Sequence, residues 1–153
     1  MALEQRVGLK LLVAVRSRDT GRAMSQENVE FARSVFSRWN AGERRFPDGE
    51  IHPDVVVVSR LLGQAVRGRA GVRRYLREID EHFDEWTMEI EDWHDAGACV
   101  AALGHVRFHG RRSGIAFDQP VGILFEIRDG QLLRFETFLD KPADALKAAG
   151  LAE

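Results

Sequence analysis

Apolar side chains recur at helical spacing in two stretches of the chain. The first stretch follows Ser25, which is a suitable N-cap, and ends at Ala41-Gly42. Its apolar positions are Val29, Ala32, Val35, Phe36 and Trp39. The second stretch begins near Gly71, and its apolar positions are Val72, Tyr75, Leu76, Ile79, Phe83 and Trp86. Each stretch places its apolar residues on one side of a helix, which predicts two amphipathic helices that cover a sheet.

The strand signals lie between and after these helices. The β-branched run Val55 to Val58 is too short for a helix and predicts a buried strand, and Gly63 and Gly68 bracket a short second strand or turn. Further strands are predicted near 86–95, 98–110, 115–128 and 131–140. The turns between them are Asp95-Ala96-Gly97, Arg112-Ser113-Gly114 and Asp129-Gly130, which predict antiparallel hairpins. A short tail helix over 143–149 ends at Gly150.

This order of elements is typical of an α+β domain. We expect a curved antiparallel sheet wrapped around the N-terminal helices. A sheet curved in this way leaves a hollow beneath the helices, and such hollows commonly form pockets lined by apolar side chains.

Residues 1–23 differ from the rest of the chain. They hold five basic and two acidic residues around a short apolar patch. Lys10 interrupts that patch, and no small-residue cleavage site follows it, so a signal peptide is not predicted. We expect an N-terminal extension over 1–23 that the fold does not need, followed by one domain over 24–153.

Composition narrows the class of partner. A formal net charge of -2 gives no bulk field that would attract nucleic acid or a membrane surface. The early apolar stretch, Leu11 to Val15, is far shorter than a bilayer span. Cys99 is the only cysteine, so no internal disulfide forms, and a reducing cytoplasm is the expected location.

Strand alternation places His105, Arg107 and His109 on one face of their strand. If that face lines the pocket, it supplies two bases and a fixed cation; the alternative is the solvated end of a long strand. Asp140 also has two interpretations: it is the N-cap of the tail helix, or it is a buried base with a raised pKa.

The catalytic candidates are therefore Asp140, His105 and Arg107. The pocket-lining candidates are Trp39, Tyr75, Glu136 and Phe138. We expect no metal site, because His105 and His109 lie about 13 Å apart on an extended strand and cannot share one ion.

Several strings resemble the SnoaL-like branch of the NTF2-like superfamily over about residues 24–151. They are Ser25-Gln26-Glu27-Asn28-Val29, Phe36-Ser37-Arg38-Trp39-Asn40-Ala41-Gly42, Asp129-Gly130-Gln131-Leu132, Leu139-Asp140 and Ala145-Leu146-Lys147-Ala148-Ala149-Gly150-Leu151. The resemblance implies a cone-shaped α+β fold over 24–153, frequent homodimers and no obligatory cofactor. The activities it implies range from isomerases, cyclases, dehydratases and epoxide hydrolases to proteins with no known reaction.

Two branches with such activities match poorly at their reactive positions. The tyrosine and two aspartates of the ketosteroid isomerase branch align with Val35, with Val58 or Ser59, and with the stretch 120–122. The limonene epoxide hydrolase branch uses an arginine flanked by two aspartates. Arg107 matches that arginine, but its neighbour on the same face is His109.

Two hypotheses for function follow. The first is acid/base chemistry of an isomerase, cyclase or hydrolase type on a small hydrophobic substrate, carried by His105, Arg107, Glu136 and Asp140. The second is a non-catalytic module that binds a small ligand or packs as a homodimer. The two differ in whether charged side chains face the interior.

Overall fold

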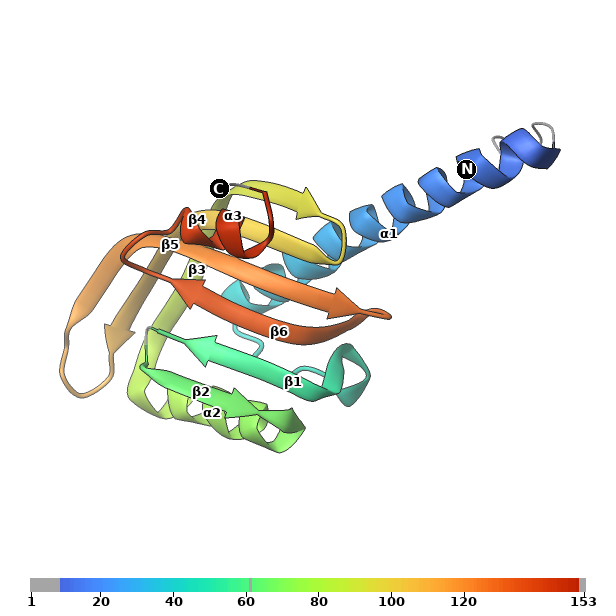
Figure 1. The fold of residues 1–153 in the computed structure, drawn as a ribbon. Coiled ribbons are helices and arrows are strands. Elements are labelled where there is room, and N and C mark those ends of the chain that lie inside the picture. Colours follow the sequence, from blue (N-terminus) through green and yellow to red (C-terminus); the bar gives the residue numbers. More distant parts are fainter. Residues whose placement is uncertain (1–8, 61, 152–153) are drawn as a thin grey trace.

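The computed structural model describes residues 9–60 and 62–151, and of residues 9–24 it describes only the backbone. Six strands form one sheet in the order β2-β1-β6-β5-β4-β3 (Figure 1). The strands are β1 (Ile51–Ser59), β2 (Gln64–Arg67), β3 (Phe83–Ala96), β4 (Cys99–Gly110), β5 (Ala116–Arg128) and β6 (Gln131–Phe138). The described helices are α1 (Leu9–Asn40), α2 (Gly68–His82) and α3 (Asp144–Ala148), with a 3-10 turn η2 (Asp48–Glu50). The predicted α+β class, with a curved and unclosed sheet, is confirmed.

Strands β3 to β6 form the predicted antiparallel meander, and β1 and β2 form a further antiparallel pair. The turn between β5 and β6 is made by Asp129 and Gly130, whose φ angles of 53° and 74° are typical of a tight hairpin. One pairing differs from the expected antiparallel pattern. β1 runs parallel to β6, with Val57 opposite Phe135, and this pairing joins the early and late parts of the chain.

The first helix is longer than predicted. α1 begins at Leu9 and continues through Ser25, so the prediction of an N-cap at Ser25 is wrong. Residues 9–24 contain no proline, and apart from Gly21 most of them favour helix, so no strong helix breaker precedes Ser25. The N-terminal turns of α1 extend away from the sheet (Figure 1). The domain boundary near residue 24 stays a prediction.

The second helix is shorter than its apolar pattern predicts. α2 ends at His82, and Phe83 and Trp86 belong to β3, where they lie opposite Gly110 and Phe108 of β4. An irregularity in the pairing between Phe83 and Glu85 lets two residues three apart share one face of the strand. Both rings still pack on the core, with their centroids 4.8 Å apart.

The helices divide between the two faces of the sheet. α1 and α2 cover what we call the inner face, where Val55, Val100, Val106 and Phe125 are fully buried. α3 packs on the opposite, outer face. Gly122 permits this contact, because a Cβ atom there would lie 2.0 Å from the carbonyl oxygen of Pro142.

The tail helix begins later than the capping interpretation of Asp140 requires. The N-cap position of α3 is Ala143, and no side chain caps it. Asp140 precedes a turn in which Asp144 N donates to Lys141 O, so the turn separates Asp140 from the helix. The prediction that Asp140 caps this helix is therefore wrong, whereas the end of the helix at Gly150, with φ at 81°, is as predicted.

The predicted homodimer would form across the open sheet surface, through Leu133, Phe135, Leu139 and the apolar positions of the 115–128 strand. Phe135 and Leu139 both pack against the core of the same chain, which leaves less of this surface for a partner. The homodimer stays a prediction.

Candidate functional site

A cavity of about 80 Å³ lies between α1, α2 and the inner face of the sheet. Its aromatic lining residues are Phe31, Phe36, Trp39, Phe46, Tyr75, Trp86 and Phe135. Its aliphatic and thioether lining residues are Val35, Ile51, Val57, Val72, Leu76, Ile79, Met88 and Leu132. Glu50 is the one lining residue with a carboxylate. The site is therefore a small hollow with mostly apolar walls.

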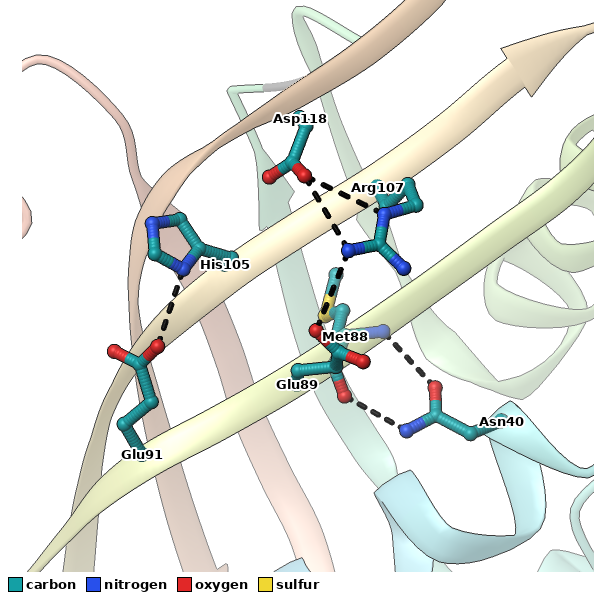
Figure 2. A network of polar contacts seen from close by, with 7 residues as sticks. All are labelled: Asn40, Met88, Glu89, Glu91, His105, Arg107 and Asp118. Carbon is teal, nitrogen blue, oxygen red and sulfur yellow. Dashed lines mark hydrogen bonds and ion pairs between the residues drawn. The ribbon is translucent and has the colours of Figure 1, made fainter.

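The end of α1 is fixed to β3 by a side-chain amide. Asn40 Nδ2 donates to Met88 O at 2.7 Å, and Met88 N donates to Asn40 Oδ1 at 2.9 Å (Figure 2). β3 is an edge strand, so the amide takes the place of a further strand at this point. The contact holds Trp39 and Met88 in the cavity wall.

A bulge in β6 brings two of its apolar residues to the same wall. Arg134 lies opposite Glu126 and Leu132 lies opposite Ile127, so Leu133 has no partner on β5. The regular alternation of side chains along a strand is therefore interrupted at Leu133. As a result, Leu132 and Phe135 both line the cavity.

Tyr75 brings a hydroxyl group to the apolar wall. Only 6% of this residue is exposed, and its side chain hydrogen-bonds that of Ser59, which is also buried. Burial raises the pKa of Tyr75, and the bond to Ser59 offsets part of that rise. The phenol therefore stays protonated at neutral pH.

Two indole nitrogens in the wall are buried. Trp39 and Trp86 are 7% and 1% exposed, and their Nε1 atoms have no hydrogen-bond partner among the described residues. A buried N–H group without a partner carries a desolvation cost. Both groups are thus suited to donate to an acceptor atom.

Arg44 connects the two tryptophans from outside the apolar wall. Its guanidinium lies 4.0 Å from the centroid of the Trp39 ring, and it donates to the carbonyl oxygens of Trp39 and Trp86. Its Nε atom lies 3.4 Å from Asp80 Oδ1. Burial lowers the pKa of Arg44, and the Asp80 carboxylate offsets part of that change. Arginine nevertheless remains charged in proteins, so Arg44 places a cation beside the cavity.

The predicted catalytic residues on β4 lie on the outer face. His105 Nδ1 lies 3.2 Å from Glu91 Oε2, and Arg107 Nη2 lies 3.4 Å from Asp118 Oδ2 and 3.6 Å from Glu89 Oε1 (Figure 2). The shared face predicted for these two side chains is present. The face carries ion pairs with neighbouring strands and is opposite to the one that lines the cavity.

The third catalytic candidate, Asp140, lies just beyond the end of β6 at Phe138. It is exposed, and the structure shows no side-chain hydrogen bond or ion pair for it within residues 25–60 and 62–151. The structure therefore does not bring Asp140, His105 and Arg107 together at the cavity. Their catalytic role stays a prediction.

The four residues expected to line a pocket separate into two pairs. Trp39 and Tyr75 are among the lining residues of the cavity, and Glu136 and Phe138 are not. Glu136 is 2.8 Å from Arg60 and 2.9 Å from Arg134 on the outer face, and Arg60 also stacks on Phe138 at 4.8 Å. Burial raises the pKa of Glu136, but the hydrogen bonds and charges of the two arginines outweigh this, so the net pKa is below its ordinary value.

Trp86, Glu50 and Arg44 contribute to the site and are not among the predicted site residues. Trp86 belongs both to the predicted helical stripe and to the strand predicted near 86–95, and the alternation of Trp86, Met88 and Ile90 favours the strand. Arg44 lies in the loop after α1 and Glu50 lies in η2, where no periodic pattern marks a site residue. The run Glu43-Arg44-Arg45-Phe46, next to a helix stop, is the signal that would have identified this loop.

Other kinds of site find little support in the described part of the chain. There, no three His, Cys, Asp or Glu side chains gather as metal ligands, and no helix is long and apolar enough to cross a membrane. Cys99 is half-buried, and burial, together with the nearby Glu126 charge, raises the pKa of its thiol. A thiol with a raised pKa is a poor nucleophile at neutral pH.

Comparisons with known proteins agree on the fold. A family model described as a SnoaL-like domain matches residues 32–135. An NTF2-like protein of unknown function from Burkholderia pseudomallei K96243 is 17% identical, with a TM-score of 0.67 over 79% of this chain and 95% of that one. A candidate SnoaL-like polyketide cyclase from Jannaschia sp. CCS1 is 23% identical, with a TM-score of 0.67 over 85% of this chain and 95% of that one.

A third similar structure is a hypothetical protein with a ketosteroid isomerase-like fold from Catenulispora acidiphila DSM 44928, in complex with trimethylamine. It is 16% identical, with a TM-score of 0.65 over 80% of this chain and 94% of that one. No curated protein matches the chain. At these identities the solved structures establish the fold alone.

Proposed function

The chain belongs to the SnoaL-like domain family, and from that premise we propose that it binds one small planar apolar molecule in the cavity between its helices and its sheet. The observation that carries the proposal is the aromatic lining of that cavity. Ligand sites are typically concave and apolar with a few polar groups. The two indole N–H groups and the Tyr75 hydroxyl belong to lining side chains and are the groups proposed to meet polar atoms of the ligand.

The size of the cavity limits the size of the ligand. The cavity has a volume of about 80 Å³, which is smaller than the roughly 150 Å³ apolar cavity that binds benzene in another protein. The part of a ligand that it encloses is therefore no larger than a single six-membered ring. An acceptor on the ring, such as a carbonyl oxygen, would satisfy Trp39 Nε1 or Trp86 Nε1.

Tryptophan fluorescence gives a direct measurement of binding. Trp39 and Trp86 line the cavity, whereas Trp93, the third tryptophan, does not. A Trp93→Phe background leaves the two reporting indoles. We expect single-ring neutral compounds such as acetophenone and benzamide to change this fluorescence with saturation and to raise Tm.

A matched pair of variants tests the location of the bound compound. Val57→Phe adds volume inside the cavity, while Val56→Phe adds the same volume on the other face of β1. Val57→Phe should abolish the response, and Val56→Phe should preserve it. Equal binding by both variants, or no response from any compound in the unsubstituted protein, would contradict the proposal.

A second candidate function is proton transfer on a bound carbonyl compound. Glu50 and Tyr75 both line the cavity and would act as base and hydrogen-bond donor. Glu50 Oε1 lies 2.9 Å from Arg38 Nη2, so a cation holds the carboxylate in place. Loss of any turnover in Glu50→Gln, with ligand affinity retained, would favour this function over simple binding.

A further inference from the structure

A second and larger hollow adjoins the aromatic cavity. It has a volume of about 770 Å³, and it shares the wall residues Phe46, Ile51 and Leu76 with the cavity. The loop after α1 and one side of α2 form its remaining walls. These three side chains therefore stand at the border between the two hollows.

The walls of the second hollow are rich in arginine. Four arginines line it, together with the acids Glu43 and Asp80; they are Arg44, Arg45, Arg73 and Arg77. We call this hollow the arginine vestibule. Its lining has an excess of positive charge, although the whole chain has a net charge of -2. Arginines therefore outnumber carboxylates in the lining beside the cavity.

Ion pairs within the protein neutralise only part of the positive charge of the arginine vestibule. Arg44 faces Asp80, and Arg73 pairs with Asp48. Arg45 and Arg77 are exposed, and the structure shows no ion pair for either of them with a described residue. These two guanidinium groups keep all their N–H donors for an external acceptor.

Resting on the proposed function, we propose that the ligand is a small aromatic carboxylate, with its ring in the cavity and its carboxylate in the arginine vestibule. A carboxylate accepts two parallel N–H groups from one guanidinium, a geometry that an ammonium cannot offer. The adjoining hollows thus suit the two parts of one molecule: an apolar ring and an anionic head group. The excess positive charge also attracts anions from solution.

The test compares acids with their uncharged amides at matched chain length. Benzoate, phenylacetate and 3-phenylpropanoate are each paired with the corresponding amide, and affinities are measured by calorimetry. We expect at least one acid to bind about tenfold more tightly than its amide, because a hydrogen bond to a charged group is stronger than one to a neutral group. Raising the ionic strength from about 10 mM to about 1 M should weaken the acid and leave the amide unchanged.

Variants that replace an arginine with an uncharged glutamine test which residues cause the preference for the acid. In Arg45→Gln/Arg77→Gln the acid and its amide should bind equally, and each single variant should show an intermediate preference. Arg74→Gln is the control, because Arg74 is an exposed arginine of α2 that is not among the vestibule residues. It should keep the full preference for the acid.

The outcomes separate this inference from the proposed function. If acids and amides bind the unsubstituted protein equally, the carboxylate assignment is overturned and the binding function stands. A preference for the acid that survives in the double variant also overturns the assignment. If neither acids nor amides bind, the proposed function fails and this inference fails with it.

Discussion

The two faces of β4 carry different side chains: apolar ones face the helices, and charged ones lie on the outer face. Val100, Ala102 and Val106 are fully buried against the helices, whereas the side chains of His105 and Arg107 are 42% and 46% exposed among carboxylates. Ion pairs remain on the outer face because charged groups there keep most of their hydration. The inner face, which encloses the cavity, carries few titratable groups. Reactive residue types along a strand therefore do not indicate the site unless their face encloses a volume.

The largest effect should come from removing a side chain of the inner face. Trp86 is 1% exposed and stacks on Phe108 with centroids 5.0 Å apart. Trp86→Ala should lower the free energy of unfolding by about 3–5 kcal/mol, because it leaves a large hole in a packed core. Urea denaturation measures the loss.

Thr87→Ala is the control for that experiment, since Thr87 is the next residue on β3 and lies on the outer face. Its effect should be below about 1 kcal/mol. Similar losses for the two variants would remove the contrast between the faces.

An intermediate effect is expected at the most buried charge of the outer face. Glu136 is 8% exposed and contacts Arg60 and Arg134. Glu136→Gln should cost about 1–3 kcal/mol near pH 7, because two charge-assisted hydrogen bonds are weakened.

The sign of the pH dependence follows from the lowered pKa of Glu136. Its pKa in the folded protein lies below the ordinary value of 4.5, so its stabilising contribution is complete above that value. The contribution is lost as the pH falls through the folded pKa. The stability difference between the protein and Glu136→Gln, measured by urea denaturation, should therefore shrink below pH 4.5. A stability difference that stayed constant to low pH would contradict this account. The control is Asp118→Asn, whose carboxylate belongs to an exposed ion pair, so its free energy of unfolding should differ little from that of the unsubstituted protein at any pH.

The smallest effects are expected at the three catalytic candidates. His105→Ala, Arg107→Ala and Asp140→Asn should each change the free energy of unfolding by less than about 0.5 kcal/mol, because exposed ion pairs contribute little. Each should also leave fluorescence-detected ligand binding unchanged. A marked loss of binding or turnover in any one of them would return the functional site to the outer face.

Local patterns predicted much of the fold. The hairpin turns at Gly97, Gly114 and Asp129-Gly130 follow from backbone conformations that few other residues adopt. The α2 stripe Val72, Tyr75, Leu76 and Ile79 was predicted and is buried. Periodicity alone could not assign Phe83 and Trp86 to a helix or to a strand. Apolar residues three apart fit a continued helix, and they also fit a strand that contains a bulge.

The site was less predictable because it depends on which face of each strand turns inward. Alternation correctly grouped His105 with Arg107 on one face of β4. It does not tell which of the two faces points inward. A bulge at Leu133 then changed the alternation along β6. The contribution of Arg44 depends on a loop that folds back onto Trp39, and such a contact leaves no periodic signal in the sequence.

The parallel pairing of β1 with β6 has a consequence for the order of biosynthesis. Translation delivers β1 early, and β2 follows at once to cover one of its edges. The other edge, along Val56, Val57 and Val58, receives its partner only when Arg134 to Glu136 have left the ribosome. Until then the nascent chain presents an open, β-branched strand edge, which is the kind of surface that pairs with other unfinished chains.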